Sequence, residues 1–221
     1  MKVLEIIQSD AEVPIGVFGD LLVEWHMPFH IVRLDIGEPL PARADAVIVL
    51  GGTMGFHDDD LHPFLPLLKQ FMGRMLAEGT PLLGVCLGAQ LLAGVSGGVV
   101  SSNCCGERGL VAIKLTAAGS ADPLLAGIPA SFKAFQWHND SFTIPPGALH
   151  LARSANCSGQ AFRIGNAWGV QFHPEVDEGI VAAWSRGLLT NEFAVAEAAH
   201  RALARQLLAN FLVEARLPAC C

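Results

Sequence analysis

The sequence predicts an α/β protein whose central sheet is largely parallel and flanked by helices, with some antiparallel strands in the middle of the chain. Three observations support this fold class. Short β-rich runs alternate with longer helical runs in the N-terminal part of the chain, an order typical of βα units. A cysteine stands between two glycines where one such strand passes directly into a helix. Further along, short strand-like runs follow one another between Pro and Gly turns, which favours antiparallel pairing.

The N-terminal part contains the alternating runs. They predict strands at 3–7, 31–35, 46–50 and 81–85, and helices at 17–27, 61–78 and 88–95. The last strand and helix are joined by a tight turn with no room for a loop. Consecutive βα units of this kind place their strands in one parallel sheet.

The rest of the chain contains a series of expected strands and then two expected helices. The expected strands are 110–115, 132–137, 149–154, 160–164 and 167–172, and the expected helices are 177–188 and 192–217. The last helix is amphipathic and rich in Ala and Leu, so we expect it to cover one face of the sheet. With 221 residues and no linker-like stretch, the chain is expected to form a single domain over 1–221.

Composition and charge argue against several classes of protein. The chain has 14 basic and 21 acidic side chains, and neither sign forms a block, so nucleic acid is not an expected partner. The first apolar run is interrupted by Glu5, which predicts no signal peptide. Residues 81–100 contain Pro81 and five glycines, which favours a buried strand-turn-helix over a membrane span. We therefore expect a cytoplasmic protein that does not bind membranes.

The cysteine and histidine patterns predict neither a disulfide framework nor a metal site. Six cysteines stand at 86, 104, 105, 157, 220 and 221, with two adjacent pairs and no Cys-x-x-Cys. We assign no role to the pairs Cys104-Cys105 and Cys220-Cys221. Residues 57–62 hold two histidines and three aspartates, which we interpret as solvated capping of the following helix. No metal or cofactor is expected.

The turn around Cys86 is the segment most informative about chemistry. Residues 84–88, Gly-Val-Cys-Leu-Gly, join a predicted strand to a predicted helix. A nucleophile at such an elbow needs a strained backbone and almost no side chain two residues to either side, which Gly84 and Gly88 provide. The helix N-terminus favours a thiolate and can bind an oxyanion. By itself, the pattern fits a small buried cysteine equally well, so a base is needed to decide.

A base and its orienting group follow far downstream. His173 and Glu175 stand two residues apart where the strand expected at 167–172 ends. This spacing puts both side chains on one face, so the carboxylate can orient the imidazole that activates a thiol. Alone, the pair fits an ordinary strand end. Together with Cys86, it predicts a Cys-His-Glu triad.

These motifs resemble those of the class I, or triad, glutamine amidotransferases, and in particular the stand-alone, GMP-synthase-like members. The nucleophile turn at 84–90 is similar to theirs, and so is the His-Pro-Glu at 173–175, which ends a strand near the C-terminus. Residues 50–55 are similar to the oxyanion loop of that family, and 169–175 to its last catalytic strand. The three motifs occur in the family's order and cover most of the chain.

The resemblance implies roles for four more residues. The backbone N–H groups of Gly52 and Leu87 are expected to stabilise the tetrahedral intermediate, and Gln90 to hold the glutamyl part of the substrate. Gly51 belongs to the same oxyanion loop. Glycines after a strand let the main chain approach a ligand closely, which is compatible with this role. Without Cys86, the two glycines would indicate only a strand-to-loop turn.

A second His-x-Asp pair competes with the first. Residues 136–142 resemble a segment that lies near the active-site side in the GMP-synthase-like members. His138 and Asp140 have strand spacing and could act as base and orienting group. Because no nucleophile accompanies them, we interpret the pair as structural or as part of the pocket edge.

The resemblance implies glutaminase chemistry on a small-molecule substrate. Cys86 would attack the side-chain amide of glutamine, His173 would protonate the leaving ammonia, and water would release glutamate from a γ-glutamyl thioester. Because no Gly-x-x-x-x-Gly-Lys-Ser/Thr phosphate loop occurs in the sequence, the ammonia would pass to a separate acceptor or synthetase. Two alternatives stay open: a γ-glutamyl peptidase or hydrolase with the same triad, and a non-catalytic regulator with the same fold.

Overall fold

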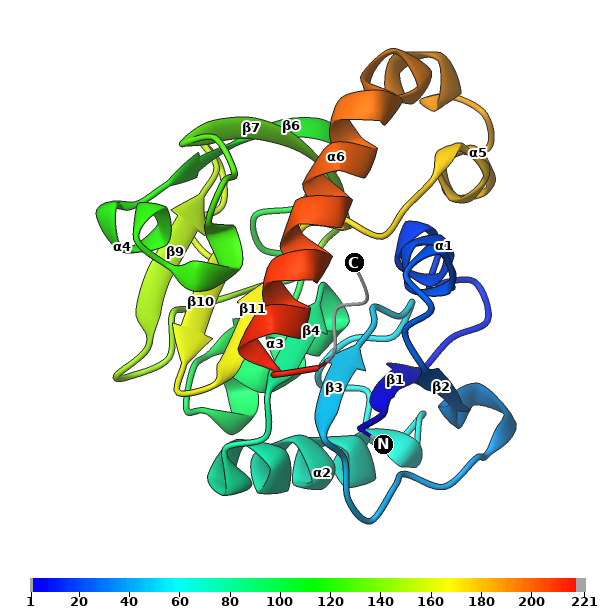
Figure 1. The fold of residues 1–221 in the computed structure, drawn as a ribbon, viewed down its shortest axis with the longest axis vertical. Helices are drawn as coiled ribbons and strands as arrows, with labels where there is room; N and C mark the ends of the chain where they lie inside the picture. Colours follow the sequence, from blue (N-terminus) through cyan, green and yellow to red (C-terminus); the bar gives the residue numbers. More distant parts are fainter. Residues whose placement is uncertain (1, 218–221) are drawn as a thin grey trace.

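A nine-stranded mixed sheet runs through the centre of the protein (Figure 1). The computed structural model describes residues 2–217, and its strand order is β2-β1-β3-β4-β11-β10-β9-β6-β7. In chain order these strands are β1 (Leu4–Gln8), β2 (Phe29–Arg33), β3 (Ala46–Val49), β4 (Leu82–Val85), β6 (Glu107–Leu115), β7 (Ser131–His138), β9 (Leu149–Arg153), β10 (Ala161–Ile164) and β11 (Ala167–Val170). Two short strands, β5 (Val100–Ser101) and β8 (Ser141–Phe142), pair antiparallel in a separate sheet.

The sheet has a parallel half and an antiparallel half. Strands β2, β1, β3, β4 and β11 run parallel to one another. From β11 onwards, β10, β9, β6 and β7 continue with antiparallel pairing. The predicted fold class is therefore confirmed. The strand β11, formed late in the chain, lies between β4 and β10 and so joins the two halves.

Helices cover both faces of this sheet. They are α1 (Val17–Glu24), α2 (Phe64–Glu78), α3 (Leu87–Val95), α4 (Ala117–Ser120), α5 (Glu178–Ser185) and α6 (Thr190–Glu214). Alternate residues of β3 point to opposite faces: Ala46 and Ile48 pack in an apolar cluster with α1 and α6, whereas Val47 and Val49 pack in a second cluster with α2 and α3. The last helix thus covers one face of the sheet, as its apolar pattern predicts.

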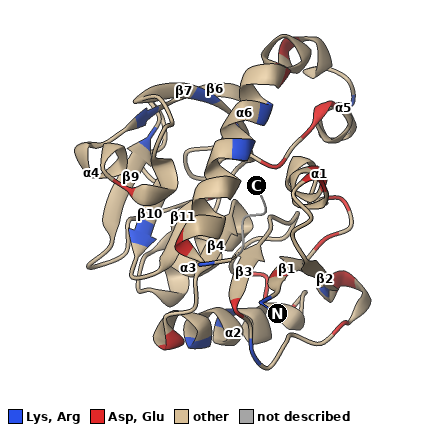
Figure 2. Cartoon of the chain, viewed as in Figure 1, with Lys and Arg blue, Asp and Glu red and all other residues tan. Residues whose placement is uncertain are grey.

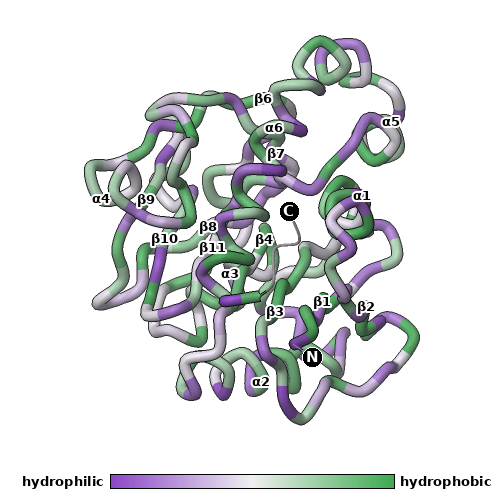
Figure 3. Tube along the Cα trace, in the orientation of Figure 1, coloured by the Kyte–Doolittle hydropathy of each residue, from purple (hydrophilic) through white to green (hydrophobic). Residues whose placement is uncertain are grey.

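The distribution of polarity follows these layers. Figure 3 shows hydrophobic residues concentrated in the central strands and in α3, and polar residues recurring along α2. Figure 2 shows acidic and basic residues interspersed along the chain, in agreement with the sequence. None of the helices in residues 2–217 is long and apolar enough to cross a membrane.

Several element boundaries differ from those predicted, for local reasons. The helix expected at 17–27 ends at Glu24, because His26 has a positive φ of 51° that an α-helix does not admit. The helix expected at 61–78 begins at Phe64, directly after Pro63. The strand expected at 31–35 is displaced to Phe29–Arg33.

The expectation for the acidic residues at 57–62 is wrong. No side chain caps α2, and its first turn contains no acidic residue. Instead, Asp58 accepts a hydrogen bond from the backbone N–H of Gly55 at 2.6 Å, and Asp59 pairs with Lys69 at 2.5 Å. One carboxylate therefore fixes the loop before α2, and the other ties that loop to Lys69 on the helix instead of capping it.

Candidate active site

Cys86 occupies the sharp turn between β4 and α3. Its φ of 50° and ψ of −105° lie outside the regions that L-residues ordinarily occupy. The backbone N–H donates to the carbonyl of Val170 at 2.9 Å, and the Cys86 carbonyl accepts from the N–H of Gln90 at 3.0 Å. A Cβ on Gly88 would overlap the carbonyl oxygen of Val49. The turn has the strained, glycine-flanked geometry that the sequence predicts.

His173 and Glu175 lie just beyond the end of β11, beside this turn. The His173 Nδ1 and Glu175 Oε1 atoms are 2.7 Å apart, and the two residues are 2% and 0% exposed. The backbone N–H of His173 donates to the carbonyl of Phe135 at 2.8 Å. Its Nε2 atom is buried and has no hydrogen-bond partner within residues 2–217. One imidazole nitrogen is thus fixed by the carboxylate, and the other is free to exchange a proton with a reacting group.

The thiol and the imidazole lie close to the same point. A Cβ placed on Gly51 would be 3.2 Å from Cε1 of His173 and 3.5 Å from Cβ of Cys86. Burial lowers the pKa of His173, but the charges of Cys86 and Glu175 outweigh it and raise the pKa to about 10. The environment therefore favours the protonated, imidazolium form of His173.

The structure brings the predicted residues together around one cavity of about 780 Å³. Cys86, His173, Gly52, Leu87 and Gln90 line it. Glu175 is buried behind His173 and Gly51 lies beside it, so neither forms part of the lining.

Gln171 contributes a contact to which the sequence motifs assigned no role. Its Nε2 donates to the Sγ of Cys86 at 3.5 Å, and its Oε1 accepts from Nε2 of Gln90 at 3.3 Å. The sequence did contain an indication that Gln171 belongs to the site, because residues 171, 173 and 175 share the two-residue spacing of one strand face. The cavity is also lined by Trp137, which lies in the 136–142 segment but was given no role there, and by three residues outside any motif, namely Arg108, Trp184 and Arg186.

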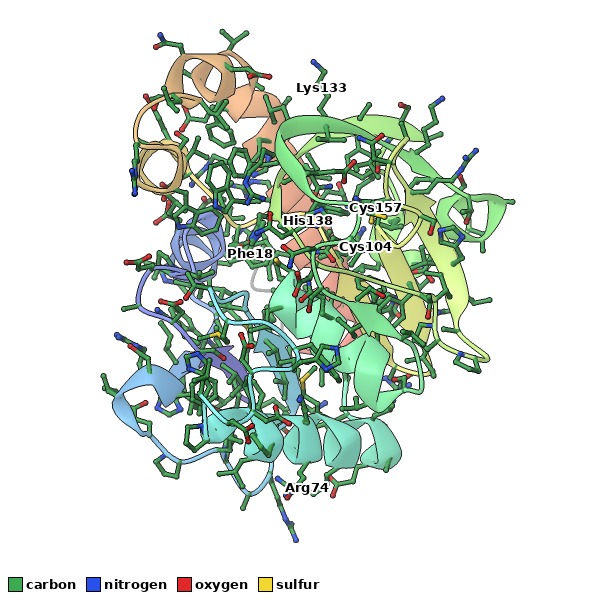
Figure 4. All side chains as sticks on the ribbon, turned by 180° about the vertical axis from the view of Figure 1, so that it is seen from behind. Phe18, Arg74, Cys104, Lys133, His138 and Cys157 are labelled. Carbon is green, nitrogen blue, oxygen red and sulfur yellow. The ribbon has the colours of Figure 1, made fainter. Side chains whose placement is uncertain are left out.

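The competing pair at the end of β7 is arranged differently from what its spacing suggests. His138 and Asp140 both line the cavity, in agreement with a place at the pocket edge. However, the His138 Nδ1 bonds to the backbone carbonyl of Asp140 at 2.9 Å, and its Nε2 is 3.5 Å from the buried carboxylate of Glu107. The Asp140 carboxylate instead accepts from the N–H of Asn103 at 2.9 Å. Figure 4 shows His138 within the molecule, whereas Lys133 of the same strand lies at its outer edge.

A third buried histidine, His200 on α6, accompanies the site. It is 2% exposed, packs edge-on against Phe193, and neither ring nitrogen has a partner within residues 2–217. Burial lowers its pKa to about 4, even though the charge of Glu175 acts in the opposite direction. His200 is therefore neutral near pH 7.

The other cysteines lie apart from the triad or outside the described residues. Cys104 and Cys105 are exposed, with their sulfurs 3.3 Å apart, and Cys157 is buried against the hydroxyl of Ser141 at 2.9 Å. Cys220 and Cys221 lie outside the described residues. Within residues 2–217, no group of three His, Cys, Asp or Glu side chains is placed to hold a metal ion.

Comparison with known proteins gives a consistent family. Residues 20–182 match the family model "Glutamine amidotransferase class-I". A GMP synthase (glutamine-hydrolyzing) from Thermomicrobium roseum is 37% identical over 131 residues, which cover 59% of this chain and 23% of that protein. One subunit of a GMP synthase (glutamine-hydrolyzing) from Picrophilus torridus is 37% identical over 150 residues, which cover 66% of this chain and 76% of that protein. A γ-glutamyl-L-1-hydroxyisopropylamide hydrolase from a Pseudomonas species is 36% identical over 148 residues, covering 62% of this chain and 49% of the hydrolase.

Two solved structures share the whole fold. A glutamine amidotransferase from Thermotoga maritima superposes with a TM-score of 0.87 at 27% identity, covering 96% of this chain and 98% of the other. A glutamine amidotransferase from Methylobacillus flagellatus gives a TM-score of 0.88 at 29% identity, covering 99% of this chain and 96% of the other.

Proposed function

Since the chain belongs to the class I glutamine amidotransferase family, we propose that it hydrolyses the side-chain amide of glutamine through a thioester on Cys86 and releases ammonia for a separate acceptor or synthetase. The observation that carries this proposal is a strained cysteine at a helix N-terminus beside a buried histidine whose Nε2 has no hydrogen-bond partner within residues 2–217. The relative from Picrophilus torridus is named as one subunit of a GMP synthase, which supports a partner encoded separately.

Each residue has a defined part in the proposed reaction. The Cys86 thiolate attacks the amide carbon, and the oxyanion is bound by the backbone N–H groups of Gly52 and Leu87. His173 donates its proton to the leaving nitrogen, which departs as ammonia while the γ-glutamyl thioester remains. His173 then accepts a proton from the attacking water, and glutamate leaves as the thiolate is restored. Glu175 holds the imidazole in its orientation throughout.

A second candidate function is hydrolysis of other γ-glutamyl amides by the same residues. Two observations favour it: the similarity to a γ-glutamyl-L-1-hydroxyisopropylamide hydrolase, and the volume of about 780 Å³, which is within the range of about 300–1,000 Å³ for pockets that hold drug-sized ligands. The two candidates differ only in the group attached to the scissile nitrogen.

The test is covalent labelling followed by product assay. A glutamine-mimicking chloroketone should add one equivalent to the wild-type protein in intact-mass spectra and none to Cys86→Ser, and glutamine turnover should require Cys86. His173→Ala should abolish labelling, while His138→Ala is the matched variant at the competing histidine. Labelling that survives His173→Ala but is lost in His138→Ala would contradict the assignment of the base.

A further inference from the structure

One wall of the cavity carries two tryptophans and two arginines that the glutaminase reaction does not use. Trp137 on β7 and Trp184 on α5 pack on the same apolar cluster, whereas α3, which holds Gln90 and Leu87, packs on a different one. The indoles and the residues expected to bind the glutamyl group are thus held by different apolar clusters. We call Arg108, Trp137, Trp184 and Arg186 the Trp–Arg wall.

The Trp–Arg wall lies where a leaving group must be. In the proposed reaction, the scissile nitrogen comes within about 2.6–3.2 Å of the His173 nitrogen that protonates it. The ring of Trp184 meets the ring of His173 edge-on, with centroids 4.9 Å apart. A substituent on that nitrogen would therefore lie against Trp184. Ammonia has no such substituent and would leave the indole uncovered.

The aromatic part of the wall is held in place before any ligand arrives. The Nε1 of Trp184 donates to the carbonyl of Glu12 at 2.7 Å. The ring of Trp137 stacks on Phe135 with an interplanar angle of 7°, and the guanidinium of Arg108 lies 4.6 Å from its centroid on the ring face. Because these rings are fixed, a ligand side chain binds to them with little further loss of conformational entropy.

The arginines add a preference for an anion. Arg108 donates to the carbonyl of His138 at 2.7 Å and to Oδ1 of Asn139 at 2.8 Å. Arg186 follows α5 and lines the cavity. Among residues 2–217, neither guanidinium has a carboxylate within 4.0 Å, so both can bind a ligand carboxylate.

Two acidic residues also line the cavity, but we assign them no part in binding a ligand carboxylate. Asp140 faces the oxyanion loop, since its Oδ2 would be 3.3 Å from a Cβ on Gly55. Glu12 is exposed, and its backbone carbonyl accepts the hydrogen bond from Trp184.

From this arrangement we propose that the leaving group is an α-amino acid with a large apolar or aromatic side chain, so that the preferred substrate is a γ-glutamyl dipeptide. Its side chain packs on Trp137 and Trp184, and its carboxylate binds Arg108 or Arg186. This inference rests on the second candidate function, the hydrolysis of γ-glutamyl amides by the residues around Cys86. Cys86 forms the C–S bond as the C–N bond breaks, His173 gives its proton to the departing α-amino group, and water then hydrolyses the thioester to glutamate.

The first experiment compares substrates on the wild-type protein. Release of free amino acid or ammonia is measured by chromatography for γ-glutamyl-phenylalanine, γ-glutamyl-glycine and glutamine. We expect kcat/KM for γ-glutamyl-phenylalanine to exceed that for γ-glutamyl-glycine by about tenfold or more, the effect of covering one large apolar side chain. Equal values, or a preference for glycine, would overturn the inference.

Variants then test whether the wall is responsible. Trp137→Ala, which does not touch His173, and Trp184→Ala should each lower the phenylalanine-to-glutamine ratio of kcat/KM by about tenfold. Trp25→Ala is the matched control, because Trp25 also lies under an arginine, Arg205 at 5.4 Å, but does not line the cavity. An equal fall in the Trp25 variant would contradict the assignment.

The contribution of the carboxylate on the leaving amino acid is tested separately with γ-glutamyl-phenethylamine, which keeps the aromatic ring and lacks that carboxylate. The double variant Arg108→Gln/Arg186→Gln should lower kcat/KM at least tenfold more for γ-glutamyl-phenylalanine than for this amide. Equal losses would refute the anion site.

Failure of this inference is distinct from failure of the proposed function. Labelling of Cys86 and turnover of glutamine without a dipeptide preference would overturn only the inference. No labelling and no turnover of any substrate would overturn both.

Discussion

At the scale of single residues, the protonation of His173 depends on Cys86. Burial alone disfavours the imidazolium, and the charge of Cys86 is the largest contribution that raises the pKa of His173 to about 10. Removing an anionic neighbour removes support for the charged form, so the pKa must fall. The acid–base state of the site is therefore a property of the pair rather than of either residue.

Cys86→Ser should lower the pKa of His173 by about 1–3 pH units, the effect of one close opposite charge. Histidine ring resonances followed by NMR from about pH 5 to well above the wild-type pKa of about 10 would measure it. Cys157→Ser is the matched control, since it removes another buried thiol. Indistinguishable His173 titrations in wild type and Cys86→Ser would show that the thiol carries no charge near this imidazole.

The meeting of Cys86, His173 and Glu175 at one site could be predicted at this scale because each motif is local. Glycine-flanked Cys86 and the two-residue spacing of His173 and Glu175 are visible in a few adjacent letters. The Trp–Arg wall could not be predicted, because Trp137 and Trp184 become neighbours only when β7 and α5 pack on one apolar cluster. No sequence spacing encodes that contact.

At the scale of elements, the β4–α3 turn depends on the absence of two side chains. A Cβ on Gly84 would come within 2.5 Å of the carbonyl oxygen of Gly88, and one on Gly88 would overlap the main chain of Val49. Backbone atoms of the central sheet cannot move aside as a flexible side chain can. The strand and the helix therefore pack this closely only with glycine at both positions.

Gly88→Ala should destabilise the protein by about 3 kcal/mol or more, at the upper end of overpacking costs because the clash is with main chain. Gly73→Ala is the matched control in α2, where an added Cβ meets nothing within 4 Å, and it should stabilise by about 0.5–1 kcal/mol. Urea denaturation of both variants measures the difference. Equal free energies of unfolding would mean that the turn can relax.

The long periodic elements were predictable and the short ones were not. Alternating strands and helices such as β3 and α2 have apolar patterns long enough to read. The pair β5 and β8 has two residues in each strand, too few to show a period of two. Helix ends such as that of α1 depend on single backbone angles, which composition does not reveal.

At the scale of the whole molecule, α6 holds a buried histidine that ties stability to pH. In the folded protein the pKa of His200 is about 4, because burial outweighs the favourable charge of Glu175, whereas in the unfolded chain it is about 6.5. Between these values the unfolded chain binds a proton that the folded protein does not. Folding is thus penalised increasingly as pH falls from about 6.5 towards 4, by an amount on the order of 3 kcal/mol.

His200→Phe should remove this part of the acid sensitivity. Urea denaturation at pH 7.5 and pH 4.5 should show the free energy of unfolding falling less in the variant than in wild type. His62→Phe, at a position that forms no ion pair among residues 2–217, is the control and should keep the wild-type dependence. Equal pH dependence in wild type and His200→Phe would refute the buried, neutral state of His200.

The place of β11 in the sheet also determines when the sheet can be completed during synthesis. During synthesis, β1, β3 and β4 leave the ribosome first and can pair, but β4 keeps an open edge until residues 167–170 emerge to fill it. The same segment delivers His173, and the carbonyl of Val170 is the group that receives the backbone N–H of Cys86. The nascent chain therefore carries a thiol without its base until the sheet closes. Under the proposed function, completion of the fold and activation of Cys86 are a single event, which spares the unfinished chain a reactive cysteine.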